Sequence, residues 1–187
     1  MNNEKKLRWQ EWLENETKLN QDFSNYKIKF LIRKIDPSLS LSKIHLNKAF
    51  HNLDFANFTI KNQLGINKRI ENETYNDWVI VISYYAMYHA AMALLYKLGY
   101  KASTHLATIC VLCKKCLGKT LEKKDIESIS KILELREEEI KEIGRAKERR
   151  ERASYSGSVS FEQQLAEMTL SDARKFINKI ADLVEKE

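Results

Sequence analysis

The chain has 187 residues, with one proline and five glycines, and 31% of its residues are charged. So few prolines and glycines favour helices over strands, because strands need turns every few residues. The formal net charge of +6 indicates an anionic partner such as RNA, a nucleotide or an acidic protein, although a basic solvated surface would explain it as well. No stretch reaches the roughly 18 apolar residues of a membrane span, and the polar N-terminus does not resemble a signal peptide. We therefore expect a cytoplasmic protein that does not contact a membrane.

The first part of the chain, residues 3–34, is predicted to form one or two charged helices. Its apolar residues recur at helical spacing in two stripes, which are Trp9, Trp12 and Leu13, then Phe23, Tyr26, Phe30 and Leu31. Asp36-Pro37 ends this segment, because the residue before a proline avoids the helical region. We therefore expect an N-terminal helical extension, residues 1–40, ahead of a main domain, residues 41–187.

Two long helices are expected to open the main domain. The first, residues 42–63, carries apolar residues close to the helical period. The second, residues 74–98, has Thr74 as its N-cap, with Asp77 at the capping-box position. It is apolar on nearly all sides, so it should be the central helix of a bundle. Gly99 then supplies the left-handed residue that ends a helix.

Three further helices are predicted. They cover residues 104–117, capped by Ser103, then residues 123–152, and finally residues 161–186, capped by Ser160. Helices in this order fit an up-and-down bundle. We predict an all-α fold, an antiparallel helical bundle with an N-terminal helical extension.

Three cysteines, Cys110, Cys113 and Cys116, lie on one predicted helix. An odd number on one short segment argues against a disulfide framework and for a reducing compartment. Structural metal sites usually need four ligands on converging elements, and no fourth ligand adjoins these three. We expect small buried thiols, with no metal and no cofactor.

Three motifs in a fixed order narrow the fold to one family. They are Ser83-Tyr84-Tyr85-Ala86-Met87-Tyr88-His89-Ala90-Ala91, then Lys101-Ala102-Ser103-Thr104-His105, then Arg150-Glu151-Arg152-Ala153-Ser154-Tyr155. Over residues 43–185 the chain resembles the prokaryotic HEPN (higher eukaryotes and prokaryotes nucleotide-binding) family. The resemblance implies an antiparallel helical bundle that is often a homodimer. It also implies roles in RNA cleavage, nucleotide binding, or toxin–antitoxin pairing with a minimal nucleotidyltransferase.

The chain departs from the family's ribonuclease motif, in which an arginine is followed by four to six residues and then by a histidine. Here Tyr155 stands where that histidine is expected after Arg150. A tyrosine titrates near pH ~10 and a histidine near pH ~6.5, so an unperturbed tyrosine is a poor general base at neutral pH. Whether the protein is an enzyme is therefore left open.

Five residues are the candidates for binding a nucleotide or RNA: Arg150, Tyr155, His105, Arg149 and Arg152. An arginine grips phosphate through two parallel hydrogen bonds, a tyrosine stacks on a base, and His105 lies near a helix N-terminus, which favours anions. Arg150, Tyr155 and His105 are also the catalytic candidates. In the alternative reading, Tyr155 packs on the bundle, Arg150 pairs with an acid, and the cations lie on a solvated helix end.

The remaining aromatic residues of the central helix are expected to be structural. His89 should be a satisfied core residue, and Tyr84, Tyr85 and Tyr88 should be core or interface aromatics. Three functions stay open: a nucleotide- or RNA-binding module, a metal-independent ribonuclease that recruits His105 or His89, and a non-catalytic scaffold. The resemblance adds a homodimer and a minimal nucleotidyltransferase as expected partners.

Overall fold

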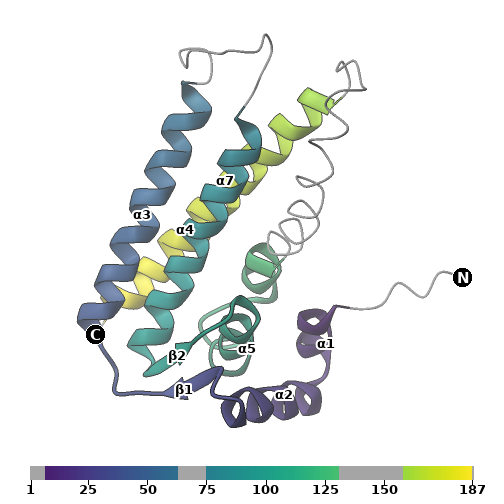
Figure 1. Cartoon of the computed structure of the whole chain (residues 1–187), viewed down its shortest axis with the longest axis vertical. Coiled ribbons are helices and arrows are strands. Elements are labelled where there is room, and N and C mark those ends of the chain that lie inside the picture. Colours follow the sequence, from purple (N-terminus) through teal and green to yellow (C-terminus); the bar gives the residue numbers. More distant parts are fainter. Residues whose placement is uncertain (1–6, 63–74, 131–157, 187) are drawn as a thin grey trace, which may run out of the picture.

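The computed structural model describes residues 7–62, 75–130 and 158–186. Three long helices form a bundle along the long axis of the molecule: α3 (Leu39–Lys61), α4 (Asn76–Lys97) and α7 (Ser158–Glu185). They lie side by side, and α3 runs antiparallel to α4 and α7 (Figure 1). The predicted helical bundle is confirmed.

Helix α4 is the spine of the bundle, as its composition predicted. It packs against α3 and α7, and four of its alanines are fully buried, which lets neighbouring backbones approach closely: Ala86, Ala90, Ala91 and Ala93. At the start of α3, the Ser42 hydroxyl donates to the Ala93 carbonyl at 2.7 Å. The Lys97 ammonium donates to the carbonyls of Leu183 and Val184 near the end of α7, each at 3.0 Å. These polar contacts fix the lower ends of the three helices together.

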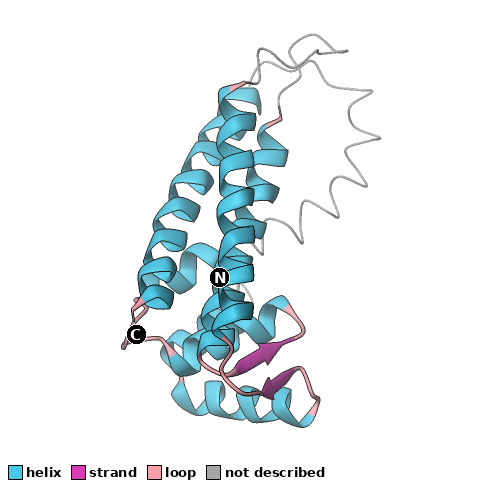
Figure 2. Ribbon diagram, turned by 90° about the vertical axis from the view of Figure 1, so that its left-hand side faces the viewer, coloured by secondary structure: helices cyan, strands magenta, loops and turns pink. Residues whose placement is uncertain are grey.

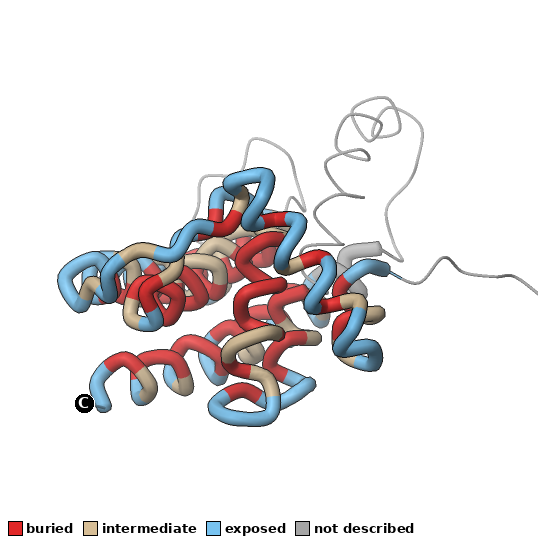
Figure 3. Tube along the Cα trace, turned by 90° about the horizontal axis from the view of Figure 1, so that it is seen from below, coloured by how far each residue is buried: buried red, intermediate tan, exposed pale blue. Residues whose placement is uncertain are grey.

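By length and composition, α4 is also apolar enough to cross a membrane. In this fold, 67% of its most apolar window is buried inside the protein. Figure 3 shows the same pattern along the trace, with buried positions on the inner sides of the helices and exposed positions facing outward. Packing within the bundle therefore accounts for the apolar character of α4.

The N-terminal segment forms two short helices, α1 (Arg8–Glu14) and α2 (Glu16–Ile28), which pack on α5 (His105–Lys115). Both tryptophans of α1 are buried, and the Trp12 indole donates to the Asp22 carboxylate at 2.9 Å. The second predicted stripe is only partly correct, because Phe30 lies outside the core. The division into an extension and a main domain at residue 40 stays a prediction.

A small sheet joins the N-terminal segment to the bundle. Strand β1 (Ile32–Lys34) pairs antiparallel with β2 (Tyr100–Ala102), next to α5 at the lower end of the molecule (Figure 2). Ile32 lies opposite Ala102, and both side chains are buried. The prediction that residues 3–34 form only helices is thus wrong, because three-residue strands are too short for a two-residue pattern and their partners lie far apart in the sequence.

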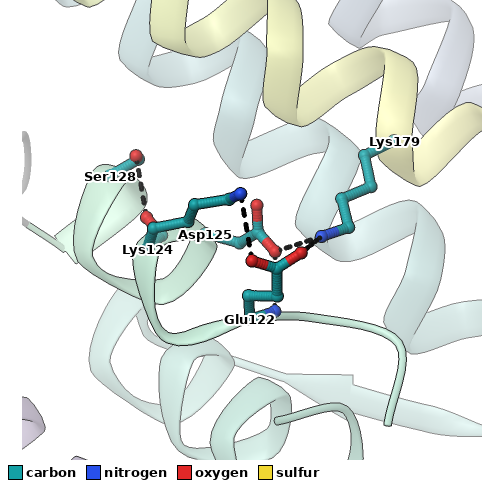
Figure 4. A network of polar contacts seen from close by, with 5 residues as sticks. All are labelled: Glu122, Lys124, Asp125, Ser128 and Lys179. Atoms are coloured by element: carbon teal, nitrogen blue, oxygen red, sulfur yellow. Dashed lines mark hydrogen bonds and ion pairs between the residues drawn. The ribbon is translucent and has the colours of Figure 1, made fainter. Parts of the chain in front are cut away.

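Residues 123–130 begin a further helix, whose start is tied to α7 by a polar network (Figure 4). The Asp125 carboxylate accepts from the Glu122 backbone N–H at 2.7 Å and from the Lys179 ammonium at 2.5 Å. Lys179 also lies 3.5 Å from the Glu122 carboxylate, and Lys124 lies 3.0 Å from it. Lys124 is the main cause of the lowered pKa of Glu122. The predicted continuation of this helix to residue 152 lies outside the described residues.

Helix ends differ from the predictions by a few residues. Tyr75, not Thr74, is the N-cap of α4, and Thr74 lies outside the described residues. Thr104, not Ser103, caps α5, because the Thr104 hydroxyl accepts from the Ala107 N–H at 3.1 Å. Helix α7 begins at Ser158, before the expected cap at Ser160. Ser103 and Thr104 are adjoining capping residues, so pattern alone does not select between them.

Candidate functional site

His105 is held in place by the chain on both sides of it. It is the first residue of α5, directly after the capping Thr104 and three residues beyond the end of β2. In the turn between them, the Ser103 N–H donates to the Leu31 carbonyl at 3.0 Å, which fixes the turn to the N-terminal segment. Sheet and cap together set the position of His105 at a helix N-terminus, where backbone N–H groups favour an anion.

Two tyrosines of α4 contact His105. The Tyr84 hydroxyl and His105 Nδ1 are hydrogen-bonded, and the ring of Tyr88 lies 4.4 Å from the His105 ring between centroids. Tyr84 and Tyr88 are four residues apart, so they share one face of the helix, and their rings stack 6.3 Å apart. We call these three residues, Tyr84, Tyr88 and His105, the His105 cluster.

Tyr88 of the His105 cluster is a neutral phenol and a poor base at neutral pH. Burial raises the pKa of Tyr88, and a hydrogen bond with Thr108 only partly opposes that rise. A phenol that donates to Nδ1 of a neutral imidazole leaves the ring proton on Nε2. The arrangement therefore orients an imidazole beside two aromatic faces, which suits contact with a phosphate, a hydroxyl or a nucleobase.

A second pair of histidines joins α3 to α4. His45 Nδ1 and His89 Nδ1 lie 3.1 Å apart, and the His45 ring stacks on Tyr96 with 5.1 Å between centroids. Burial, His89 and Lys48 lower the pKa of His45 to about 4, and burial and Lys48 lower the pKa of His89. His89 is thus half-buried and paired, as expected of a satisfied histidine, but its partner lies 44 positions away and no sequence pattern connected them.

A family model, the HEPN domain, matches residues 45–183, most of the chain. The chain belongs to the HEPN domain family. It is also similar to the UPF0332 protein of Archaeoglobus fulgidus, with 32% identity over 106 residues, which cover 56% of this chain and 72% of that protein. Membership of the HEPN family supports a general nucleotide- or RNA-related function.

Of the predicted HEPN site residues, His105 lies in the described structure and contacts Tyr84 and Tyr88. The other four, Arg149, Arg150, Arg152 and Tyr155, lie outside the described residues, so their place relative to His105 stays a prediction. Sequence reasoning treated the tyrosines only as structural aromatics. Their four-residue spacing was visible, but their contact with His105 depends on how α5 packs on α4.

No metal centre forms among the described residues, which hold no group of three or more potential His, Cys, Asp or Glu ligands. All three cysteines are free and buried, as predicted. Burial raises the pKa of Cys113 to about 12 and that of Cys116 to about 11. Because a metal or an electrophile reacts with the thiolate, these side chains behave as inert apolar groups at neutral pH.

Proposed function

We propose that this HEPN protein binds RNA or a nucleotide phosphate through the His105 cluster, together with Arg150 and Tyr155 from the basic stretch. The observation that carries the proposal is the hydrogen bond between Tyr84 and His105 at the N-terminus of α5. It orients an imidazole where a helix terminus attracts negative charge. Tyr88 adds an aromatic face beside it. Arg149 and Arg152 would strengthen the positive potential.

Titration of a fluorescein-labelled RNA oligonucleotide, with ATP as competitor, tests this proposal by fluorescence anisotropy. Tyr84→Phe removes only the hydroxyl group that holds His105, and His105→Ala removes the imidazole. Each should weaken binding about tenfold, the usual scale for one hydrogen bond to a charged group. Tyr85→Phe is the matched control, because it removes the same hydroxyl from the neighbouring position. Affinities that are unchanged in His105→Ala and in Arg150→Ala would contradict the named site.

A second candidate function, a metal-independent ribonuclease, is favoured by the same hydrogen bond. In this function the Tyr84 hydroxyl would accept from Nδ1–H of His105, which leaves Nε2 unprotonated to act as general base on a ribose 2′-hydroxyl. Its test is cleavage of RNA in EDTA, with a 2′-deoxy substitution at the cleaved nucleotide as control. Cleavage that His105→Ala and the 2′-deoxy substrate both abolish supports this function, and no cleavage by the wild type in EDTA at any pH removes it.

The partners of the protein are proposals of the same kind. A homodimer and a nucleotidyltransferase partner in a toxin–antitoxin pair are both implied by the family resemblance. An exposed apolar face on α3, with Leu41, Ile44, Phe55 and Phe58, supports the homodimer.

A neighbouring nucleotidyltransferase gene and co-purification with its product would support the toxin–antitoxin pair. The alternative is a scaffold without a ligand. The free buried thiols fit the cytoplasmic location that we propose.

A further inference from the structure

The exposed face of the β1–β2 sheet carries two cations side by side. Arg33 lies directly opposite Lys101 in the register, and both are exposed. Lys34, the next residue of β1, points to the other face of the sheet, as Ile32 does. Side chains at opposite positions of an antiparallel pair lie about 5 Å apart, where like charges repel. Within the described residues, no ion pair joins either Arg33 or Lys101 to a carboxylate. This uncompensated charge favours an anion above the sheet.

An aromatic ring stands beside these cations in an unusual backbone conformation. Phe30 has a φ of 57° and is 69% exposed, and the Arg33 guanidinium lies 6.0 Å from the centre of its ring. A bulky residue at positive φ is strained, and a phenylalanine left in water gains little from burial. Neither the backbone conformation nor burial in the core therefore explains why a phenylalanine occupies this position.

The surrounding fold holds Phe30 beside the sheet. The Leu31 N–H donates to the Tyr26 carbonyl at 2.9 Å, and the Leu31 carbonyl accepts from the Ser103 N–H at 3.0 Å. The turn is thus fixed on one side to the end of α2 and on the other to the segment that follows β2. Lys29, the exposed C-cap of α2, adds another cation directly before Phe30.

We propose that Lys29, Phe30, Arg33 and Lys101, here called the sheet surface, bind single-stranded RNA. The cations contact phosphates, and Phe30 stacks on one base, the combination that binds single strands without sequence preference. The sheet surface is distinct from the His105 cluster. Three of its residues precede the matched HEPN region, which begins at residue 45.

The chain path connects the sheet surface to the His105 cluster. Lys101 lies on β2, and the chain continues through Ser103 and Thr104 directly into α5 at His105. The sheet surface is thus separated from His105 by only three residues of the chain. The sheet surface would act as an added anchor for RNA, supplied by the segment that precedes the HEPN region.

The test is the binding of a fluorescein-labelled 20-nucleotide oligo-uridine RNA to the full chain between 50 and 200 mM KCl. The variant Arg33→Ala/Lys101→Ala removes both opposed cations. Binding should weaken about tenfold, and the slope of log affinity against log salt should become shallower by about 1.4, which is about 0.7 for each lost phosphate contact on a single strand. The control Lys61→Ala/Lys175→Ala removes the same charge from exposed positions on α3 and α7. Equal effects of the two double variants overturn the proposal.

Phe30→Gly separates binding from folding. Glycine adopts positive φ without strain, so the melting temperature should stay the same or rise, while RNA affinity falls about fivefold or more with the loss of stacking. Unchanged RNA affinity in Phe30→Gly overturns the stacking role.

His105→Ala separates the two proposed sites. A loss of RNA affinity confined to His105→Ala supports the His105 cluster and overturns the sheet surface, and a loss confined to the sheet-surface variants does the reverse. Phosphatidylserine vesicles test the other polyanion. If the wild type binds these vesicles through Arg33 and Lys101 but does not bind the RNA, the assignment to RNA is wrong.

Discussion

At the scale of single residues, the contact between His45 and His89 links two helices through neutral side chains. A hydrogen bond between two imidazole nitrogens needs one protonated and one unprotonated nitrogen, which two neutral rings can supply. A proton added to either ring introduces a charge into a half-buried site close to Lys48, and the lowered pKa of both histidines expresses that cost. The pair therefore holds α3 on α4 most firmly when both rings are neutral.

The pH dependence of stability follows from this pair. An unfolded histidine titrates near pH ~6.5, whereas folded His45 titrates at about 4. Between these values the unfolded chain binds more protons, so the free energy of unfolding should fall as the pH decreases from about 6.5 toward 4, and the full contribution is present above that range. Urea unfolding at pH 7.5, 6.0 and 5.0 measures the fall.

His45→Phe keeps the ring that stacks on Tyr96 but cannot take up a proton, so its stability should depend less steeply on pH than that of the wild type. Lys175→Ala, an exposed position on α7, is the control and should retain the wild-type slope. If His45→Phe loses stability with acid as steeply as the wild type does, the pair is not the origin of the effect.

At the scale of secondary structure, sequence patterns located the long helices but not the sheet. The period of apolar residues placed α3 within three residues of its observed start, because a long amphipathic helix repeats its signal over many turns. Strands β1 and β2 have three residues each, and their register depends on a turn and a helix end that lie far apart in the sequence. Phe30 was wrongly assigned to an apolar stripe. Its left-handed backbone breaks the helical period, and the pattern of apolar residues does not reveal that break.

Gly99 ends α4 and places β2 against β1. Its φ is +74°, and an added Cβ would lie 2.8 Å from the Ile35 carbonyl oxygen, which belongs to the residue whose N–H donates to the Gly99 carbonyl at 3.0 Å. Gly99→Ala should therefore lower the free energy of unfolding by about 2–3 kcal/mol, from backbone strain and from this clash. Chemical denaturation measures the loss.

Gly118 provides the matched comparison. Its φ is +73°, but an added Cβ would meet nothing within 4 Å. Gly118→Ala should thus cost only the backbone strain, about 1 kcal/mol. Equal losses in the two variants would show that the approach of Gly99 to Ile35 does not contribute.

The N-terminal helices are held together by the buried bond from Trp12 to Asp22. Trp12→Phe keeps most of the ring but leaves the buried carboxylate without its indole donor, so the free energy of unfolding should fall by about 1–3 kcal/mol. A double-mutant cycle with Asp22→Ala should give a coupling energy above about 0.5 kcal/mol. Additive losses would mean that the tryptophan acts only by filling space.

At the scale of the whole molecule, the candidate site was only partly visible in the sequence. The motif on α4 and the turn before His105 identified the family and one site residue. The contact of His105 with Tyr84 and Tyr88 arises when α5 packs on α4, and an ordering of motifs along the chain does not specify that geometry. The basic residues near Arg150 stay a sequence-based prediction.

The outer face of α3 carries the last prediction, which concerns the proposed homodimer. Leu41, Ile44, Phe55 and Phe58 are all exposed on this face, and Trp78 of α4 lines one apolar groove with the two phenylalanines. From Leu41 to Phe58 the face is about 26 Å long at 1.5 Å per residue, so it extends along most of α3. Antiparallel pairing about a two-fold axis at His51 would place Ile44 opposite Phe58 of the second copy.

Sedimentation equilibrium of the full chain should therefore report a dimer. Phe55→Glu/Phe58→Glu should dissociate it, because four carboxylates would enter one apolar interface. Met168→Glu, on the exposed side of α7, introduces a charge at a similarly exposed apolar position and should leave the dimer intact. A wild-type monomer, or a dimer that withstands the α3 substitutions, would contradict this interface, since the apolar face would then have no role in self-association.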